Sequence, residues 1–90
     1  MSVTVSNQKL DIRDYVSPLS VLKVQSVLNN MKANQTLEVW LIDSETKLVL
    51  EQIIKNSNNE LVGIEKEGEY EKIYIKKYVL KSHQGKDPRW

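Results

Sequence analysis

The residues of this chain best placed to do chemistry lie in the stretch LDIRDYVSPLSVL, residues 10–22. Ser17 directly precedes Pro18, and an amphipathic run follows. A serine hydroxyl there can cap a helix or, beside a general base, act as a nucleophile. The one histidine, His83, lies close to the other end of the chain, and no Ser/His/Asp set is visible. We therefore do not expect an acyl or phosphate hydrolase.

Composition excludes several other function classes. The chain has no cysteine, so thiolate chemistry and disulfides are absent. A single histidine cannot build a metal site, and we expect no metal and no cofactor. The net charge of +1 provides no bulk attraction to nucleic acid or to a membrane, and we expect neither as a partner. Because the N-terminus MSVTVSNQKL lacks a basic segment followed by an apolar one, we expect a cytoplasmic protein.

The first half of the chain shows a strand and a helix. Alternation over residues 9–13 predicts a short strand with Leu10 and Ile12 facing inward. Apolar residues then recur at spacings of three and four, which predicts a helix over about residues 18–32 with Ser17 as its N-cap and Pro18 as its first residue. The expected buried stripe is Val21, Val24, Leu28 and Met31, with Leu22 and Val27 beside it.

The second half predicts three strands and one helix. Alternation predicts a strand over 36–42, with Leu37, Val39 and Leu41 inward. A helix capped by Asp43 or Ser44 should cover 45–56. Strands over 60–67 and 71–78 should form a hairpin around Gly68. The expected inward residues of the helix are Leu48, Val49, Ile53 and Ile54, and those of the last strand are Ile73, Ile75 and Val79.

The resulting order is β-α-β-α-β-β. Ninety residues make one domain, and right-handed crossovers place both helices on the same side. We therefore expect an α/β (α+β) two-layer sandwich, with a four-stranded mixed sheet and two helices on one face. Residues 9–78 form the domain, residues 1–8 precede it as an extension, and residues 79–90 form a polar, flexible tail.

The uncovered sheet face is a candidate partner surface. The outward residues expected there are Trp40, Ile42, Tyr74, Lys76 and Tyr78. Trp40, Tyr74 and Ile42 together would form an apolar patch that suits a homodimer or another protein. Tyrosines alternating with lysines over residues 70–78 could also stack unpaired bases, although strand propensity and solubility account for the same pattern.

The order of elements and the opening stretch together resemble the TusA family of small sulfur carriers. That family reads Leu-Asp-x-x-Gly-x-x-Cys-Pro-x-Pro, then an amphipathic helix, then Gly-x-x-Leu-x-Val leading to an Asp. This chain reads Leu10-Asp11, then Ser17-Pro18-Leu19-Ser20, then NQTLEVWLID over 34–43. Asn58-Asn59-Glu60-Leu61 stands where the family often has Gly-His-Glu-Leu, and the resemblance covers about residues 9–77.

Three departures from that pattern bear on function. The family glycine falls at Asp14, its second proline at Ser20 and its active cysteine at Ser17. The resemblance implies that position 17 would carry persulfide sulfur, with Pro18 fixing the helix start and the backbone donors of Leu19 and Ser20 cradling an anion there. Asp11 and Arg13 could orient the loop before the helix, although exposed strand charges account for them better. The resemblance also implies a cysteine desulfurase or another sulfurtransferase as partner.

Serine cannot form a persulfide, so the chain as written would not carry sulfur. The serine is either an engineered replacement or a natural divergence. Two functions follow from the sequence. The chain is a sulfur-relay protein of tRNA thiolation or sulfur metabolism, or it is a non-catalytic module of the same fold that binds a protein or cofactor through its open sheet face.

Overall fold

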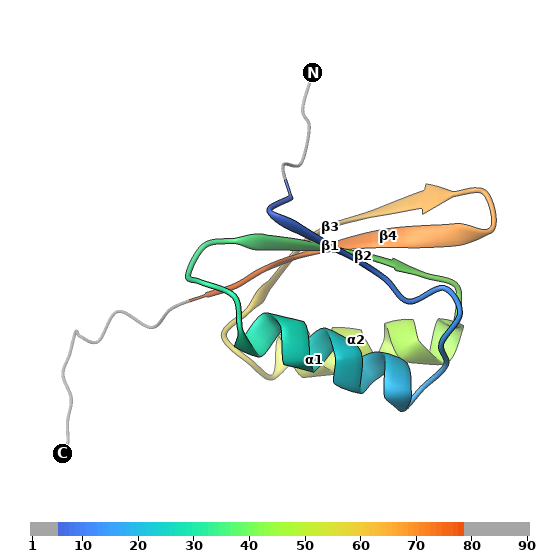
Figure 1. The fold of residues 1–90 in the computed structure, drawn as a ribbon, viewed down its shortest axis with the longest axis horizontal. Coiled ribbons are helices and arrows are strands. Elements are labelled where there is room, and N and C mark those ends of the chain that lie inside the picture. Colours follow the sequence, from blue (N-terminus) through green and yellow to red (C-terminus); the bar gives the residue numbers. More distant parts are fainter. Residues whose placement is uncertain (1–5, 79–90) are drawn as a thin grey trace, which may run out of the picture.

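The computed structural model describes residues 6–78, which form two layers (Figure 1). The elements follow one another as β1 (Gln8–Asp11), α1 (Leu19–Asn29), β2 (Thr36–Leu41), α2 (Ser44–Lys55), β3 (Glu60–Glu67) and β4 (Tyr70–Lys76). This is the predicted order β-α-β-α-β-β. The predicted bounds differ from the observed ones by no more than three residues at any end.

The four strands form one mixed sheet in the order β1-β2-β4-β3. β1 pairs parallel with β2, and β4 pairs antiparallel with both of its neighbours. β3 therefore runs parallel to β2 although β4 lies between them. Figure 1 shows both helices on the same side of this sheet. The predicted two-layer sandwich with one uncovered sheet face is confirmed.

The core lies between the sheet and the helix layer. Inward residues of β2 and β4 are at most 1 % exposed, as expected from their alternation. The predicted stripe of α1 is also buried. The side chains that make up the core are Ile12, Val21, Val24, Leu28, Met31, Leu37, Val39, Leu41, Leu50, Ile54, Ile73 and Ile75.

Two predicted core leucines face solvent instead. Leu22 is 58 % exposed and Leu48 is 63 % exposed. In α1 the predicted stripe is buried, Ser20 joins it, and Leu22 lies on a different face of the helix. In α2 the polar Thr46 belongs to the buried stripe, so this stripe differs from the one that apolar spacing alone indicates. In α2 the stripe runs from Thr46 through Leu50, which the sequence analysis missed.

Some of the turns and helix caps predicted from the sequence are observed, and one is not. Gly68 has a φ of 63° in the β3–β4 hairpin, a conformation that glycine adopts without strain. Asp43 caps α2 and accepts a hydrogen bond from the Thr46 N–H. The prediction for Ser17 is wrong, because the N-cap of α1 is Pro18 and no side chain bonds to the first turn. The predicted inward Val79 lies outside the described residues.

The two leucines of α2 allow a matched test of this packing. We expect Leu50→Ala to lower the free energy of unfolding by about 2–5 kcal/mol, because it opens a cavity beneath the sheet. Leu48→Ala should change it by less than about 0.5 kcal/mol, because that side chain faces solvent. Urea unfolding followed by circular dichroism measures both, and equal losses would contradict the assigned face of α2.

Candidate functional site

The loop before α1 brings residue 17 to one end of the helix layer. It begins at Ile12, which is fully buried and whose N–H donates to the Trp40 carbonyl at 2.9 Å. Tyr15 N–H then donates back to the Ile12 carbonyl at 3.1 Å. These contacts lead the chain off the edge strand and hold Ser17, half-buried, at the start of α1. The position of residue 17 is thus set by a buried anchor.

The carboxylate of Asp43 connects residue 17 to the second helix. Its Oδ2 accepts the Ser17 backbone N–H at 3.0 Å, although the two residues are far apart in the chain. The same oxygen accepts the Thr46 hydroxyl at 2.6 Å and the Thr46 N–H at 3.2 Å. The hydrogen bond from the Thr46 side chain, then that from Ser17, lowers the pKa of Asp43. The carboxylate is therefore ionised at neutral pH, at the start of both helices.

A buried hydroxyl pair continues this network into the core. Ser20 is fully buried, and its Oγ lies 2.6 Å from Thr46 Oγ1. Because the Thr46 hydroxyl donates to Asp43, the Ser20 hydroxyl must donate to Thr46. The bonds therefore have one direction, from Ser20 through Thr46 to Asp43. Ser20 occupies the place of the second proline in the motif described above and serves to lock α1 against α2.

Of the two backbone N–H groups expected to be available at the start of α1, only that of Leu19 has no acceptor within residues 6–78. Ser20 N–H is not free, because it donates to the Val16 carbonyl at 3.1 Å. Within residues 6–78, the N–H groups of Leu19 and Val21 have no acceptor. Unpaired donors at a helix start favour an anion, but here the Asp43 carboxylate already lies beside residue 17. Any anionic group at position 17 would form next to that charge.

The comparisons with known proteins agree with this arrangement. A family model described as "Sulfurtransferase TusA" matches residues 8–77. That range extends from β1 to just beyond β4 and covers both helices. This chain belongs to the TusA family. The resemblance drawn from the motif is thereby confirmed.

Two relatives carry names of the same kind. The chain is 37 % identical over 68 residues to a protein of Thermotoga maritima named "Putative sulfur carrier protein", covering 74 % of this chain and 86 % of that one. It is 28 % identical over 68 residues to "Putative sulfur carrier protein YrkF" of Bacillus subtilis. That match covers 76 % of this chain but only 37 % of the Bacillus protein. Membership of the TusA family supports a role in sulfur relay.

Asp11 and Arg13, the loop residues expected to support position 17, form a rigid group on the uncovered sheet face. The guanidinium donates to both carboxylate oxygens of Asp11, at 2.9 and 2.8 Å. It also lies over two rings, 5.0 Å from that of Trp40 and 4.7 Å from that of Tyr70. The hydrogen bonds from Arg13 lower the pKa of Asp11. In this TusA-family chain the loop is thus fixed from the sheet side as well as from the helix side.

The expected aromatic patch is assembled differently. Trp40 stacks with Tyr70, at 5.4 Å between ring centroids, and not with Tyr74. Tyr74 is only 5 % exposed and donates its hydroxyl to Glu65 at 3.0 Å. Burial, then this hydrogen bond, raises the pKa of Tyr74 to about 12. The Trp40 ring has Lys9, Arg13 and Lys72 within 6 Å of its centroid. Cations therefore cover much of the aromatic surface.

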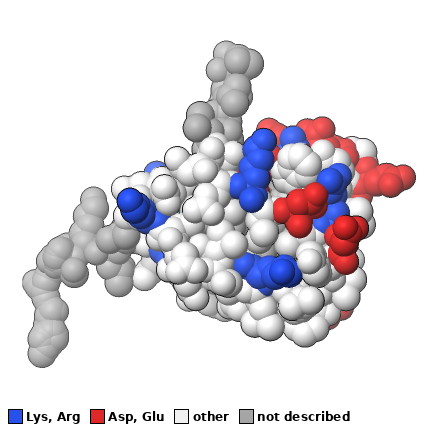
Figure 2. All heavy atoms as spheres, in the orientation of Figure 1, with Lys and Arg blue, Asp and Glu red and all other residues white. Residues whose placement is uncertain are grey.

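The other predicted surface residues do not join this group. Ile42 follows the last residue of β2 and is 53 % exposed. Lys76 is half-buried at the end of β4, and Tyr78 is 45 % exposed beyond it. Figure 2 shows charged side chains gathered toward the β3–β4 hairpin, whereas the surface over α1 is mostly uncharged.

A buried acid on the sheet face escaped the sequence analysis. Glu38 is only 6 % exposed and accepts the Ser6 hydroxyl at 2.9 Å and the Trp40 indole N–H. Burial acts to raise the pKa of Glu38, but these hydrogen bonds outweigh it and the pKa is lowered. The alternation that places Leu37 and Val39 inward also puts Glu38 on the opposite sheet face. Its burial depends on long-range neighbours that no local pattern reveals.

Within residues 6–78, neither a metal-binding cluster nor a membrane-spanning helix is present. Those residues contain no group of three potential metal-ligating side chains. Neither helix in this range has the length and apolar character needed to cross a membrane. His83, the one histidine, lies outside the described residues.

Asp43→Asn tests the connection between the two helix starts. The pKa of Asp43 lies below its ordinary value near 3.8, so its ionised form stabilises the fold above that pH. This stability is lost as the pH falls through the lowered pKa. We expect Asp43→Asn to lower unfolding stability at pH 7 and to weaken its fall below about pH 4. Ser44→Ala, at an exposed neighbouring position, should reproduce the parent curve. Parent-like unfolding of Asp43→Asn at both pH values would contradict this role.

Proposed function

We propose that this chain works in sulfur relay and that Ser17 stands where a TusA carrier holds its persulfide cysteine. The observation that carries the proposal is the fixed place of residue 17, at the start of α1 with its backbone N–H on Asp43. This bond involves the backbone, so it is the same for serine and cysteine. A cysteine here would have a half-buried sulfur at the end of the helix layer.

The chemistry of a relay explains why serine cannot complete it. A carrier thiolate attacks the terminal sulfur of a persulfide on the donor protein. A new S–S bond forms, the donor S–S bond breaks, and the donor cysteine leaves as a thiolate with the electron pair. Serine offers a hydroxyl of far higher pKa and cannot make the S–S bond. This chain with Ser17 would therefore bind its partner without accepting sulfur.

The partner proposed is a cysteine desulfurase or another sulfurtransferase, acting in tRNA thiolation or sulfur metabolism. Its docking surface is an apolar rim around position 17, formed by Val16, Leu19 and Leu22, which are 65, 51 and 58 % exposed. α1 carries one charged residue, Lys23. An exposed apolar group of this kind next to a reactive position is typical of a protein interface. The exposed Leu22, wrong as a core residue, thereby gains a role.

The alternative is a non-catalytic module that binds a protein or cofactor, or a second copy of itself, through the open sheet face. The Arg13–Trp40–Tyr70 stack favours it, because rigid aromatic and arginine groups are common binding anchors. Substitutions at different positions distinguish the two functions. Trp40→Ala should abolish binding for the module, whereas the relay depends on position 17 and the rim.

Ser17→Cys provides the test of the relay. The chain has no other cysteine, so any sulfur gained is assigned without ambiguity. We expect the variant, incubated with a cysteine desulfurase and free cysteine, to gain the mass of one sulfur atom and to lose it on reduction. The parent chain should gain none. The matched control is Ser26→Cys, an exposed serine in the middle of α1, which should load far more slowly. Equal loading at both positions would overturn the proposal.

A change in the rim tests the docking surface separately. In the Ser17→Cys background, Leu19→Asp should reduce the rate of enzymatic loading at least about tenfold, which corresponds to about 1.4 kcal/mol of lost interaction. Alkylation of the introduced thiol by a small reagent should continue, since position 17 stays accessible. Leu48→Asp, at an exposed leucine on α2, should load at the parent rate. An unchanged loading rate for Leu19→Asp would show that the rim is not part of the docking surface. It would not affect the proposal for position 17.

A further inference from the structure

Asp43 places a full negative charge where the two helices begin. Both helices follow parallel strands, so they run in the same direction and start at the same end of their layer (Figure 1). Each helix start carries a partial positive charge of about half a unit. The ionised carboxylate of Asp43 carries a whole unit, and its Oδ2 accepts hydrogen bonds from both starts, through Ser17 N–H and Thr46 N–H. It therefore offsets the positive ends of both helices at once.

The side chain of residue 17 lies close to this charge. The distance from Asp43 Oδ2 to the Ser17 nitrogen is 3.0 Å. The terminal side-chain atom of a serine or a cysteine is three bonds from its own nitrogen, so at position 17 it lies within about 7 Å of the carboxylate in any rotamer. Residue 17 is also half-buried, which reduces screening by water. A negative charge so near disfavours a second one on the side chain.

No cation among residues 6–78 forms an ion pair with Asp43. Lys23 of α1 lies over the Tyr15 ring, 4.7 Å from its centroid, and Lys47 of α2 donates to Glu71 at 3.1 Å. The charge of Asp43 is thus balanced by helix starts and hydrogen bonds. The charged or titratable residues of the loop before α1, of α1 and of the first turn of α2 are Arg13, Asp14, Tyr15, Lys23, Glu45 and Lys47.

We propose that Asp43 keeps the side chain at position 17 uncharged at neutral pH and so limits its reactivity as a nucleophile. This control acts on the site proposed above and therefore rests on the proposed function. A helix start ordinarily favours a thiolate, which is the reactive form of cysteine. Because Asp43 already offsets the helix starts, a thiol at position 17 stays protonated, and small electrophiles and oxidants react with it slowly. Asp43 is then a positioning residue whose charge also sets the reactivity of its neighbour.

The pH dependence of alkylation tests this control in the Ser17→Cys chain. The chain has no other thiol, so the rate of reaction with iodoacetamide against pH gives the pKa of that one group. We expect a pKa at or above the ordinary thiol value of about 8.5. Asp43→Asn should lower it by about one unit, because the amide oxygen can still accept the N–H of residue 17 while the charge is gone. An unchanged pKa would overturn the proposal.

Glu45→Gln is the matched control for charge. It removes the same charge from an exposed residue in the first turn of α2. In the Ser17→Cys chain it should lower the thiol pKa by less than about a third of the Asp43→Asn effect, because water and salt screen an exposed charge. Equal effects of the two substitutions would contradict a specific role for Asp43.

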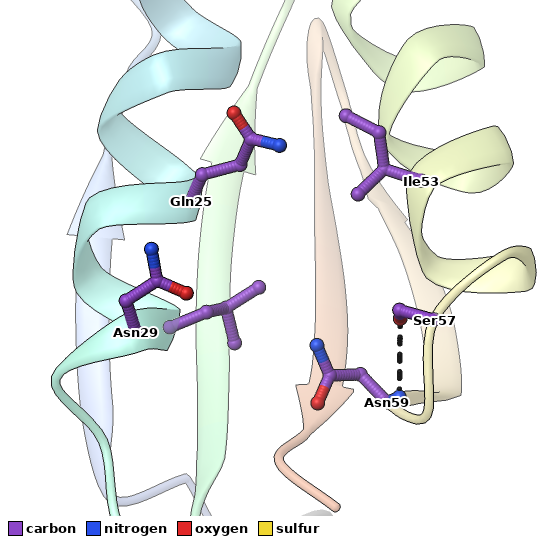
Figure 3. A pocket seen from close by; sticks show the side chains of 6 residues that line it. Gln25, Asn29, Ile53, Ser57 and Asn59 are labelled. Carbon is purple, nitrogen blue, oxygen red and sulfur yellow. Dashed lines mark hydrogen bonds between the residues drawn. The ribbon is translucent and has the colours of Figure 1, made fainter.

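A groove at the other end of the helix layer provides a control for distance (Figure 3). It encloses about 310 Å³ between the C-terminal halves of the helices, and none of its lining residues is charged. Ser57 lies there, after α2, whose twelve residues span about 18 Å. Salt screens the charge of Asp43 over that length. The residues that line the groove are Gln25, Leu28, Asn29, Ile53, Ser57 and Asn59.

Ser57→Cys in the chain that keeps Ser17 places the single thiol in this groove. Asp43→Asn should change the pKa of that thiol by less than about 0.2 units, because the charge is too far away. A change as large as the one at position 17 would show that loss of Asp43 disturbs the whole helix layer, and it would contradict a local electrostatic effect.

These measurements use no partner protein, so they separate this control from the relay itself. If Ser17→Cys accepts no sulfur from a desulfurase while Asp43→Asn still lowers its pKa, the relay is wrong and the effect of Asp43 is supported. If the thiol accepts sulfur but its pKa does not respond to Asp43→Asn, the control by Asp43 is wrong and the relay is supported.

Discussion

One carboxylate organises the end of the molecule where residue 17 lies. Asp43 caps α2 through Thr46 and holds the backbone of Ser17 with the same oxygen. The loop before α1 has its other anchor in Ile12, on the far side of the core. Without Asp43 the two helices would still be joined by the buried Ser20–Thr46 pair, but the backbone of residue 17 would lose its hydrogen bond to the start of α2. The location of the candidate site therefore depends on a side chain outside the motif that points to it.

On the uncovered sheet face, charged side chains lie over most of the aromatic rings. An exposed aromatic face would attract other proteins without selectivity. Here Arg13 and two lysines lie over Trp40, the buried Tyr74 donates its hydroxyl to the exposed Glu65, and Glu38 is buried and accepts hydrogen bonds from Ser6 and Trp40. The result is a stiff polar and aromatic layer. It braces β1 and the loop that follows, so the sheet face contributes to placing residue 17.

The strands and their inward residues could be predicted from the sequence. The predictions that were wrong, or were not made, concern contacts between residues far apart in the chain. Alternation in β2 and β4 identified the inward residues because strand geometry has a strict period of two. The buried faces of the helices were harder to predict, because Ser20 and Thr46 are polar but buried. Their burial depends on the hydrogen bond between them across the helix interface. The family motif located residue 17 but not its contact with Asp43. That contact joins residues twenty-six positions apart, and Asp43 alone is sufficiently explained as a helix cap.

The parallel direction of the helices separates two kinds of surface. Their starts meet at Asp43, beside the apolar rim and two N–H groups that have no acceptor among residues 6–78. Their ends meet at the groove, among amides and carbonyl groups. What holds residue 17 is a backbone bond, and what surrounds it is an apolar rim, so neither depends on whether its side chain ends in oxygen or sulfur. A cysteine at position 17 would therefore meet the same backbone bond and the same exposed apolar neighbours as the serine does.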